Sequence, residues 1–189
     1  MSELLQNIHD KTLKSVLSDT NLAKRFFTQH LPNDIQTQVK LDSLRLQKGS
    51  FVDAKLSEHL TDLLYSVELG QGEGYIYLLL EHQSSPDRLM AFRLLKYMVN
   101  IMEHHLKKHK TKTLPLVFPM VYYTGARKAT QFVPDMMDLF EQPELAKAHF
   151  LKPFTLIDLQ RLSDDELLKD KALAGIYRSP LKLQILAVD

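Results

Sequence analysis

Three polar side chains near the ends of two neighbouring apolar segments carry the clearest chemical signal in the sequence. Asp62 opens a run in which apolar and polar residues alternate, and Glu81 and Gln83 close a second run after a glycine-rich turn at 70–74. If the two runs pair as a β-hairpin, these three side chains gather at its open end. Carboxylates about 4.5 to 8 Å apart on paired strands repel each other unless one is protonated or a cation lies between them.

Such an arrangement could hold a divalent cation. Oxygen ligands from two acids suit Mg²⁺, which keeps several waters and often binds a substrate phosphate as well. The ion can polarise a phosphodiester, lower the pKa of an attacking water and stabilise the leaving oxygen. The backbone carbonyl of His82 is available as a further ligand. On spacing alone, a solvated polar rim on the hairpin is the more frequent alternative, because exposed strand faces are often acidic.

The alternation also predicts a register for the hairpin. With a loop at 71–74, Asp62 faces Gln83 and Leu64 faces Glu81. One face of the hairpin is then almost wholly apolar, and it comprises Leu63, Tyr65, Val67, Leu69, Ile76, Leu78, Leu80 and His82. A one-residue slip would mix the apolar and polar sets, so the pattern favours this register or its two-residue neighbour.

Helical and extended segments surround the hairpin in a mixed order. Periodicity and cap residues predict helices over 4–17, 22–30, 85–110, 134–140 and 141–149, a helix start at 163–166, and strands over 39–46, 61–69, 75–83, 114–123 and 154–159. The segment 114–123 is apolar enough for a central buried strand, but Pro115 and Pro119 lack amide donors, so part of it must avoid full pairing. This order predicts a mixed α/β domain around a small sheet.

Composition narrows the class of protein. The chain has 189 residues, with 24 Lys and Arg against 23 Asp and Glu, so bulk charge does not argue for a nucleic-acid partner. There is no cysteine, which excludes disulfides, thiolate zinc sites and cysteine nucleophiles. The N-terminus lacks the pattern of a signal peptide, and no apolar run has the roughly 18–20 residues that span a bilayer. We therefore expect a soluble, cytoplasmic protein without membrane contacts.

A second candidate group lies in the basic stretch 104–112. Lysines and histidines there suit the carboxyl end of a helix, and contact with a phosphate backbone is the functional alternative. His105 and His109 are four residues apart on one helical face and could bind zinc, but the sequence shows no third ligand for them. Asp10 either approaches the acidic site from the first helix or is a surface acid.

Six short motifs together resemble the Rpn family, the recombination-promoting nucleases formerly described as transposases. They are His9-Asp10-Lys11, Gly49-Ser50-Phe51-Val52-Asp53, Asp62-Leu63-Leu64-Tyr65, Glu81-His82-Gln83-Ser84-Ser85-Pro86, Met90-Ala91-Phe92-Arg93 and Tyr122-Tyr123-Thr124-Gly125. The resemblance covers residues 8–177. It divides the chain into a nuclease-like domain at 1–177 and an atypical C-terminal tail at 178–189, which could be a truncated continuation.

The resemblance implies a fold and an activity. The family is assigned to the PD-(D/E)xK nucleases, which implies a restriction-endonuclease-like α/β core, a small mixed sheet with a central hairpin flanked by helices, and cleavage of DNA with Mg²⁺ or another divalent cation. By position, Asp62 and Glu81 are the metal-binding acids and Gln83 is the third catalytic residue. Gln83 replaces the usual lysine and cannot supply its positive charge. A catalytically inactive DNA-binding or protein-interaction module of the same fold is the alternative.

DNA is the implied partner, in the context of recombination or transposition. Arg88, Arg93 and Lys96 lie at the start of the long helix, near the open end of the hairpin, and are candidates for contacting DNA. Hydrolysis of both strands would favour a homodimer. Tyr122 and Tyr123 end a strand, and a role in the core is more common at such positions than base stacking.

Overall fold

The computed structural model describes residues 12–47, 61–70, 72–81, 86–125 and 128–158, with only the backbone described at positions 61 and 81. The chain forms two compact units, Met1–Ala146 and Lys147–Asp189. The sheet and the helices that pack on it belong to the first unit. The domain boundary predicted at 177–178 and the helix start at 163–166 lie outside the described residues.

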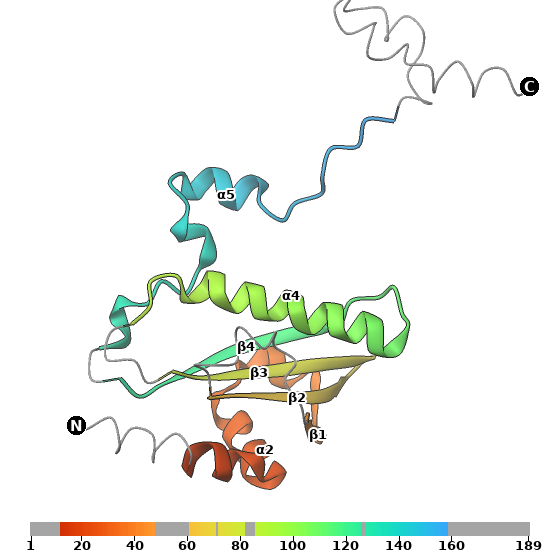
Figure 1. Ribbon diagram of the computed structural model, residues 1–189, viewed down its shortest axis with the longest axis vertical. Coiled ribbons are helices and arrows are strands. Elements are labelled where there is room, and N and C mark those ends of the chain that lie inside the picture. Colours follow the sequence, from red (N-terminus) through yellow and green to blue (C-terminus); the bar gives the residue numbers. More distant parts are fainter. Residues whose placement is uncertain (1–11, 48–60, 71, 82–85, 126–127, 159–189) are drawn as a thin grey trace, which may run out of the picture. The chain divides into compact units, whose positions relative to one another are not determined.

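A four-stranded sheet forms the centre of the first unit (Figure 1). Its strands are β1 (Val39–Leu46), β2 (Thr61–Leu69), β3 (Glu73–Glu81) and β4 (Leu116–Tyr123), in the order β1-β2-β3-β4. The first three strands are antiparallel neighbours, and β4 runs parallel to β3. A parallel pair needs a crossover connection, and helix α4 (Met90–His109) provides it. The predicted hairpin is therefore β2–β3, and it forms the two central strands.

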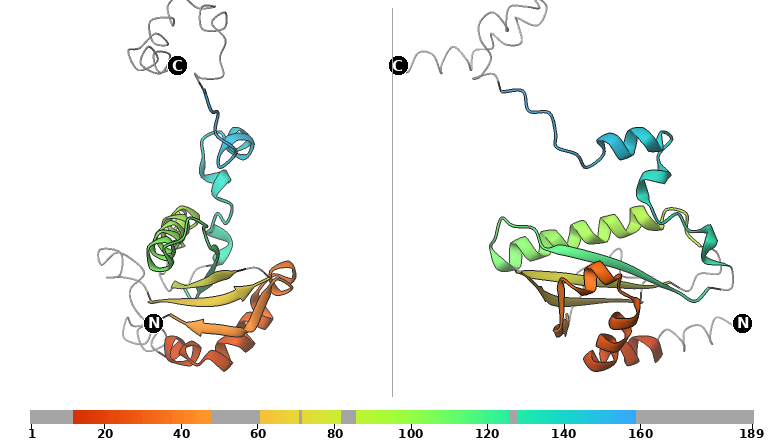
Figure 2. Two further views of the ribbon diagram at one scale, coloured as in Figure 1. Left: turned by 90° about the vertical axis from the view of Figure 1, so that its right-hand side faces the viewer. Right: turned by 180° about the vertical axis from the view of Figure 1, so that it is seen from behind.

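Helices cover both faces of this sheet, as the side view shows (Figure 2). Below the sheet in Figure 1 lies α2 (Thr20–His30), which follows a helical stretch at 12–18 and precedes the short helix α3 (Asn33–Gln36). The core on this side contains Leu17, Ala23, Phe27, Leu31, Val39, Leu44, Leu63, Tyr65, Val67, Ile76, Leu78 and Leu80. It includes every described member of the apolar hairpin face predicted from alternation except Leu69, which is partly buried against it.

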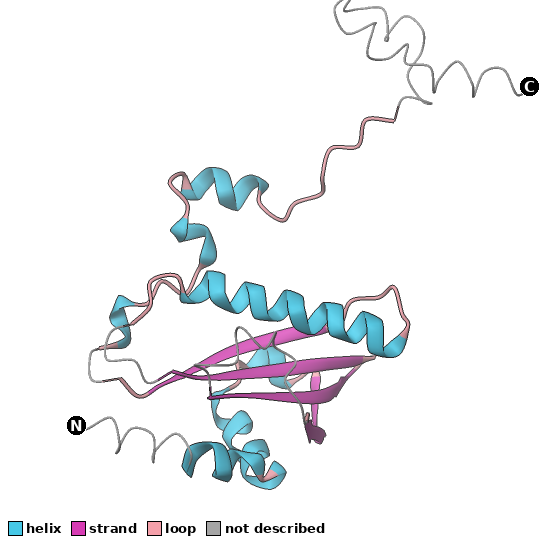
Figure 3. Cartoon of the chain, viewed as in Figure 1, coloured by secondary structure: helices cyan, strands magenta, loops and turns pink. Residues whose placement is uncertain are grey.

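The second face of the hairpin is also buried, beneath α4 (Figure 3). Its core contains Leu64, Tyr75, Tyr77, Leu79, Met90, Tyr97, Ile101 and Val117. This explains why β3 is apolar at nearly every position, since a strand covered on both faces has no side that must be polar. The molecule is thus a mixed α/β fold with a four-stranded mixed sheet flanked by helices, consistent with a restriction-endonuclease-like core.

The helix ends follow from local chemistry. Asp19 caps α2 by accepting hydrogen bonds from the backbone amides of Asn21 and Leu22, at 2.8 and 3.1 Å. Helix α4 ends at Lys110, which adopts a left-handed conformation with φ of 50° after a basic last turn.

The hairpin register predicted from alternation is wrong by four residues along β3. Asp62 pairs with Leu79 rather than Gln83, and Glu68 pairs with Glu73. Gly72 has φ of +95°, so the turn forms around it, and the strand β3 begins two residues earlier than expected. The shift preserves the two faces, because it moves the pairing by an even number of residues.

Two strand predictions also need correction. The segment 116–123 is an edge strand, not a central one, and an edge position tolerates Pro119 because one side of the strand needs no amide donor. The strand predicted at 154–159 is absent from the described residues 154–158, which have no regular structure.

The segments predicted as helices after β4 form shorter elements. The prediction at 134–140 becomes the 3₁₀ turn Met136–Leu139, and that at 141–149 becomes the helix α5 (Pro143–His149). A further 3₁₀ turn, Ala129–Gln131, was not predicted. Within the described part of the chain, none of the helices combines the length and the apolar character that crossing a bilayer requires.

Replacing Gly72 with alanine should destabilise the protein, because its φ of +95° is strained for any residue with a Cβ. No atom lies within 4 Å of the added methyl group, so any loss of stability arises from backbone conformation alone. We expect the free energy of unfolding in urea to fall by about 1–2 kcal/mol. The matched change Gly70→Ala also meets no neighbour and has no left-handed φ, and it should leave stability equal or slightly higher. Equal losses in the two variants would contradict the assigned turn.

Candidate active site

Asp62 lies at the start of β2, on the face of the sheet that packs beneath α4. Its side chain is half-buried, and the hydroxyl of Tyr77 donates a hydrogen bond to its Oδ2 at 2.9 Å. Tyr77 is almost completely buried on β3. Burial raises the pKa of this tyrosine far above its usual value, and the negative charge of Asp62 raises it further, so the phenol remains a donor. The hydrogen bond fixes one carboxylate oxygen, and the other can ligate a cation.

Position 81 lies on the same face of the neighbouring strand. It is the last residue of β3, two residues beyond Leu79, which pairs with Asp62. Diagonal positions of this kind are about 7–8 Å apart between Cα atoms. The register thus keeps the positions of the two predicted metal-binding acids together, although it pairs them differently than expected. The side chain of Glu81 and the whole of Gln83, like Asp10, lie outside the described residues.

Tyr123 contributes a third feature to this end of the sheet. It is the last residue of β4 and the pairing partner of position 81. Its hydroxyl is buried and has no hydrogen-bond partner among the residues that the structure describes, while its ring packs edge-on against Phe132 at 5.0 Å. A buried hydroxyl without a partner is costly, and a bound water, phosphate or ion would satisfy it.

The three basic residues predicted to contact DNA lie in different environments. Arg93 is half-buried, and its Nη1 donates to Oδ2 of Asp87 at 2.8 Å. Its charge lowers the pKa of Tyr77, against the larger opposing effects of burial and Asp62. Arg88 and Lys96 are exposed, just before and on α4 respectively. Arg93 thus acts electrostatically on the Tyr77 hydroxyl, whereas Arg88 and Lys96 lie at the surface.

The side chains at the end of the sheet that carries Asp62 suit a hard divalent cation. Carboxylate, carbonyl and hydroxyl oxygens are the ligands that Mg²⁺ prefers. The Asp62 carboxylate is held by Tyr77 and is partly exposed, and the Tyr123 hydroxyl lies one strand beyond position 81. Sequence reasoning did not single out Tyr77, and it weighed Tyr123 only as a core or base-stacking residue, because a tyrosine within an apolar strand has the pattern of an ordinary core residue.

A second polar cluster lies at the opposite end of the hairpin. Glu73, the first residue of β3, lies near His105 and His109 on the last turns of α4, and their ligand atoms all lie within 4.8 Å of one another. The Tyr75 hydroxyl lies 2.9 Å from Nδ1 of His105 and 3.2 Å from Oε2 of Glu73. Burial lowers the pKa of His105, and the neighbouring His109 adds to this effect against the pull of Glu73. Glu73 is the third ligand candidate that the sequence alone did not show.

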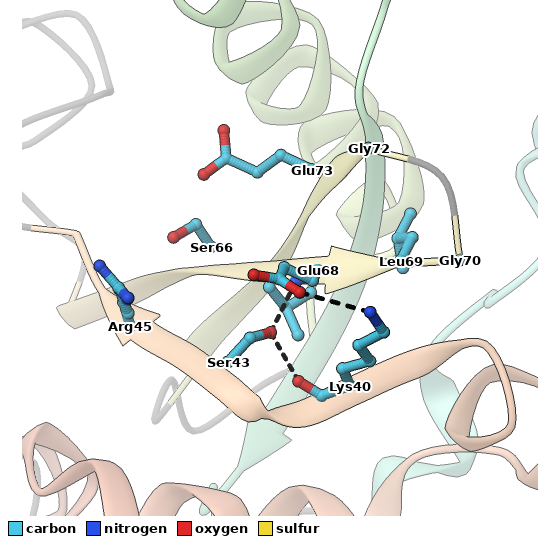
Figure 4. A pocket seen from close by; sticks show the side chains of 10 residues that line it. Lys40, Ser43, Arg45, Ser66, Glu68, Leu69, Gly70, Gly72 and Glu73 are labelled. Carbon is cyan, nitrogen blue, oxygen red and sulfur yellow. Dashed lines mark hydrogen bonds and ion pairs between the residues drawn. The ribbon is translucent and has the colours of Figure 1, made fainter.

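A pocket of about 520 Å³ opens beside this second cluster, at the turn end of β1, β2 and β3 (Figure 4). It is lined by Lys40, Ser43, Arg45, Ser66, Val67, Glu68, Leu69, Gly70, Gly72 and Glu73. The charges in its wall are mixed, and Lys40 pairs with Glu68 across the strands at 3.5 Å. The pocket is thus remote from Asp62, which lies at the other end of β2.

Comparisons with known proteins agree with the family resemblance that the sequence motifs indicate. Residues 7–181 match the family described as "Putative transposase, YhgA-like". Recombination-promoting nuclease RpnD of Escherichia coli O157:H7 is 39% identical over 166 residues, which are 88% of this chain and 64% of that protein. RpnC of Escherichia coli K12 is 38% identical over 168 residues, or 88% of this chain and 55% of that protein.

One relative carries a different description. The "Inactive recombination-promoting nuclease-like protein RpnE" of Escherichia coli K12 is 34% identical over 166 residues, which are 88% of this chain and 55% of that protein. The chain thus spans about half to two-thirds of the length of these curated relatives. No solved structure is significantly similar to it. The match over most of its length shows that the chain belongs to the Rpn family of YhgA-like, recombination-promoting nucleases.

Proposed function

We propose that this chain is a metal-dependent DNA endonuclease domain that hydrolyses phosphodiester bonds during DNA recombination. The observation that carries this proposal is the Asp62 carboxylate, held by Tyr77 on the same face as position 81 of the adjoining strand. Two relatives of this chain are named recombination-promoting nucleases, which supports the same reaction class.

Asp62 and Glu81 would hold Mg²⁺ or another divalent cation at this site. When bound, such an ion polarises the scissile phosphate and favours deprotonation of the attacking water. Tyr77 keeps the carboxylate of Asp62 in one orientation, so little reorganisation is needed when a substrate arrives. Gln83 would orient the attacking water by hydrogen bonding, because an amide can both donate and accept.

Arg93 offers the positive charge that Gln83 lacks. Asp87 fixes its guanidinium, and its charge acts on the Tyr77 hydroxyl next to Asp62. A guanidinium fork matches the oxygens of a phosphate and cannot lose its proton at physiological pH. Arg93 would therefore stabilise the charge that develops on the scissile phosphate, as the motif lysine does in related nucleases.

DNA would approach across the amino-terminal part of α4. Arg88 and Lys96 are exposed there and would contact the phosphate backbone without reading sequence. Cleavage of both strands would favour a homodimer, which supplies one active site for each strand.

A second candidate function is DNA binding without cleavage. Gln83 replaces the motif lysine, and the relative named inactive is similar over as much of this chain as the relatives named nucleases are. The two candidates differ in metal dependence. An inactive module would retain DNA in a salt-dependent manner with or without a divalent ion and would leave plasmid intact.

Incubation of the purified protein with supercoiled plasmid and Mg²⁺ tests the proposal. We expect cleavage that EDTA abolishes and that Asp62→Asn slows at least 100-fold, or about 2.7 kcal/mol in the activation barrier. The matched control is Glu68→Gln, an exposed acid on the same strand and the same face but at its far end. Cleavage lost equally in both variants, or unchanged in Asp62→Asn, would contradict the assignment of Asp62.

Tyr123→Phe should separate function from stability. Removing a buried hydroxyl that has no partner among the described residues leaves the free energy of unfolding equal or higher. Loss of a hydrogen bond to a charged phosphate, in contrast, slows cleavage by about 10-fold or more. Tyr65→Phe is the opposite control, because that hydroxyl donates to the carbonyl of Leu17 in the other layer. It should cost about 1 kcal/mol of stability and leave the specific activity unchanged. If Tyr123→Phe cleaves plasmid at the same rate as the wild-type protein, Tyr123 does not belong to the active site.

The salt dependence of DNA binding tests the proposed DNA-binding surface. Each phosphate contact contributes about 0.9 to the slope of log affinity against log salt concentration. Arg88→Gln and Lys96→Gln should each lower that slope by about this amount in fluorescence anisotropy. Arg25→Gln removes an exposed charge from α2 in the opposite layer and should leave the slope unchanged. If Arg25→Gln has the larger effect, DNA binds on the other face.

A further inference from the structure

The polar cluster at the carboxyl end of α4 contains three side chains of metal-ligating type from two separate elements. His105 and His109 are one helical turn apart on α4, with ring centroids 4.4 Å apart, and Glu73 comes from the start of β3. The chain brings these residues together over a sequence separation of more than 30 positions.

The distances within the cluster are close to those of a tetrahedral site. Nε2 of His109 lies 3.4 Å from Oε2 of Glu73, and Nδ1 of His105 lies 3.7 Å from the same oxygen. Ligand bonds of about 2.0–2.2 Å at tetrahedral angles place two donor atoms about 3.4 Å apart. A single ion can therefore be reached by all three side chains after small rotations.

The donor set selects the class of metal. Two imidazole nitrogens and one carboxylate oxygen suit Zn²⁺ and its first-row neighbours, whereas Mg²⁺ prefers a shell of oxygens. Three protein ligands leave a fourth position for water. His105 is buried, while His109 and Glu73 are partly exposed, so an ion can enter from solvent and from the adjoining pocket.

Tyr75 supports the ligands from below. Its buried hydroxyl is within hydrogen-bond distance of Glu73 and of His105. An ion bound to Nδ1 of His105 would replace the Tyr75 hydroxyl at that nitrogen. Burial raises the pKa of this phenol well above its usual value, so it would then give its one proton to the Glu73 carboxylate and hold it in place. Support of this kind distinguishes the cluster from a glutamate and two histidines that meet by chance on a surface.

This cluster is separate from the proposed nuclease site. Glu73 pairs with Glu68, six residues along β2 from Asp62, which corresponds to about 20 Å of strand. We propose that Glu73, His105 and His109 bind a zinc-class divalent ion that joins the carboxyl end of α4 to the start of β3. The site goes beyond the nuclease function and does not depend on it.

Isothermal titration of the full chain with Zn²⁺, after EDTA treatment and in millimolar Mg²⁺ to fill oxygen sites, tests this proposal. We expect one Zn²⁺ per chain, and at least 100-fold weaker binding in His109→Ala and in Glu73→Gln. The control His104→Ala removes an exposed histidine next to the cluster and should change the affinity less than twofold. Tyr75→Phe should weaken binding by about 10- to 100-fold, as expected for a residue that supports a ligand.

Thermal unfolding followed by circular dichroism provides a second readout. Zn²⁺ should raise the melting temperature of the wild-type protein and of His104→Ala, but not that of His109→Ala. Co²⁺ should give the intense visible absorption of a four-coordinate site in the same two proteins. Failure of the wild-type protein to bind Zn²⁺, or equal binding by His109→Ala and wild type, would overturn the site. Neither result bears on plasmid cleavage, so the two proposals fail independently.

Discussion

The hydroxyl groups of buried tyrosines determine where polar chemistry can occur on the α4 side of this sheet. Burying a phenol without a hydrogen-bond partner costs about 1–3 kcal/mol, so a polar group within reach of a buried hydroxyl is strongly favoured. Tyr77 reaches Asp62, and Tyr75 reaches Glu73 and His105. Each carboxylate drawn in this way is oriented and partly removed from water, which prepares it to bind a cation. Two neighbouring tyrosines on one strand thus organise polar clusters at opposite ends of the hairpin.

Local pattern was sufficient to predict most elements of the fold. Period-two alternation identified β2 and β3 and assigned their faces correctly, and helical periodicity placed α4 within a few residues. The register could not be predicted, because it depends on which glycine forms the turn. Gly72 takes the left-handed conformation, whereas Gly74 lies within β3, where a Cβ would lie 3.1 Å from the carbonyl oxygen of Leu116. That contact joins strands more than 40 residues apart, and alternation carries no information about it.

The candidate site was predicted only in part for the same reason. The acidic residue Asp62 was identified because a carboxylate at the end of an apolar strand is conspicuous. The places of Tyr77 and Tyr123 in this site were not predicted, because they depend on what lies opposite these residues on neighbouring strands. The pair His105 and His109 was visible as a helical repeat, but its third member, Glu73, follows a turn and comes close only through the packing of α4 on β3. Interactions between distant segments, rather than residue types, were the missing information.

The most direct test of the account is whether a hard divalent ion binds at Asp62. Crystals of the protein grown with Mn²⁺ in place of Mg²⁺ would show the ion by its anomalous scattering, since the two ions favour similar oxygen ligands. The account predicts an anomalous peak about 2 Å from a carboxylate oxygen of Asp62, on the side away from Tyr77. Mn²⁺ bound elsewhere in the same crystals, with no peak beside Asp62, would contradict the assignment of this end of the sheet as a hydrolytic site.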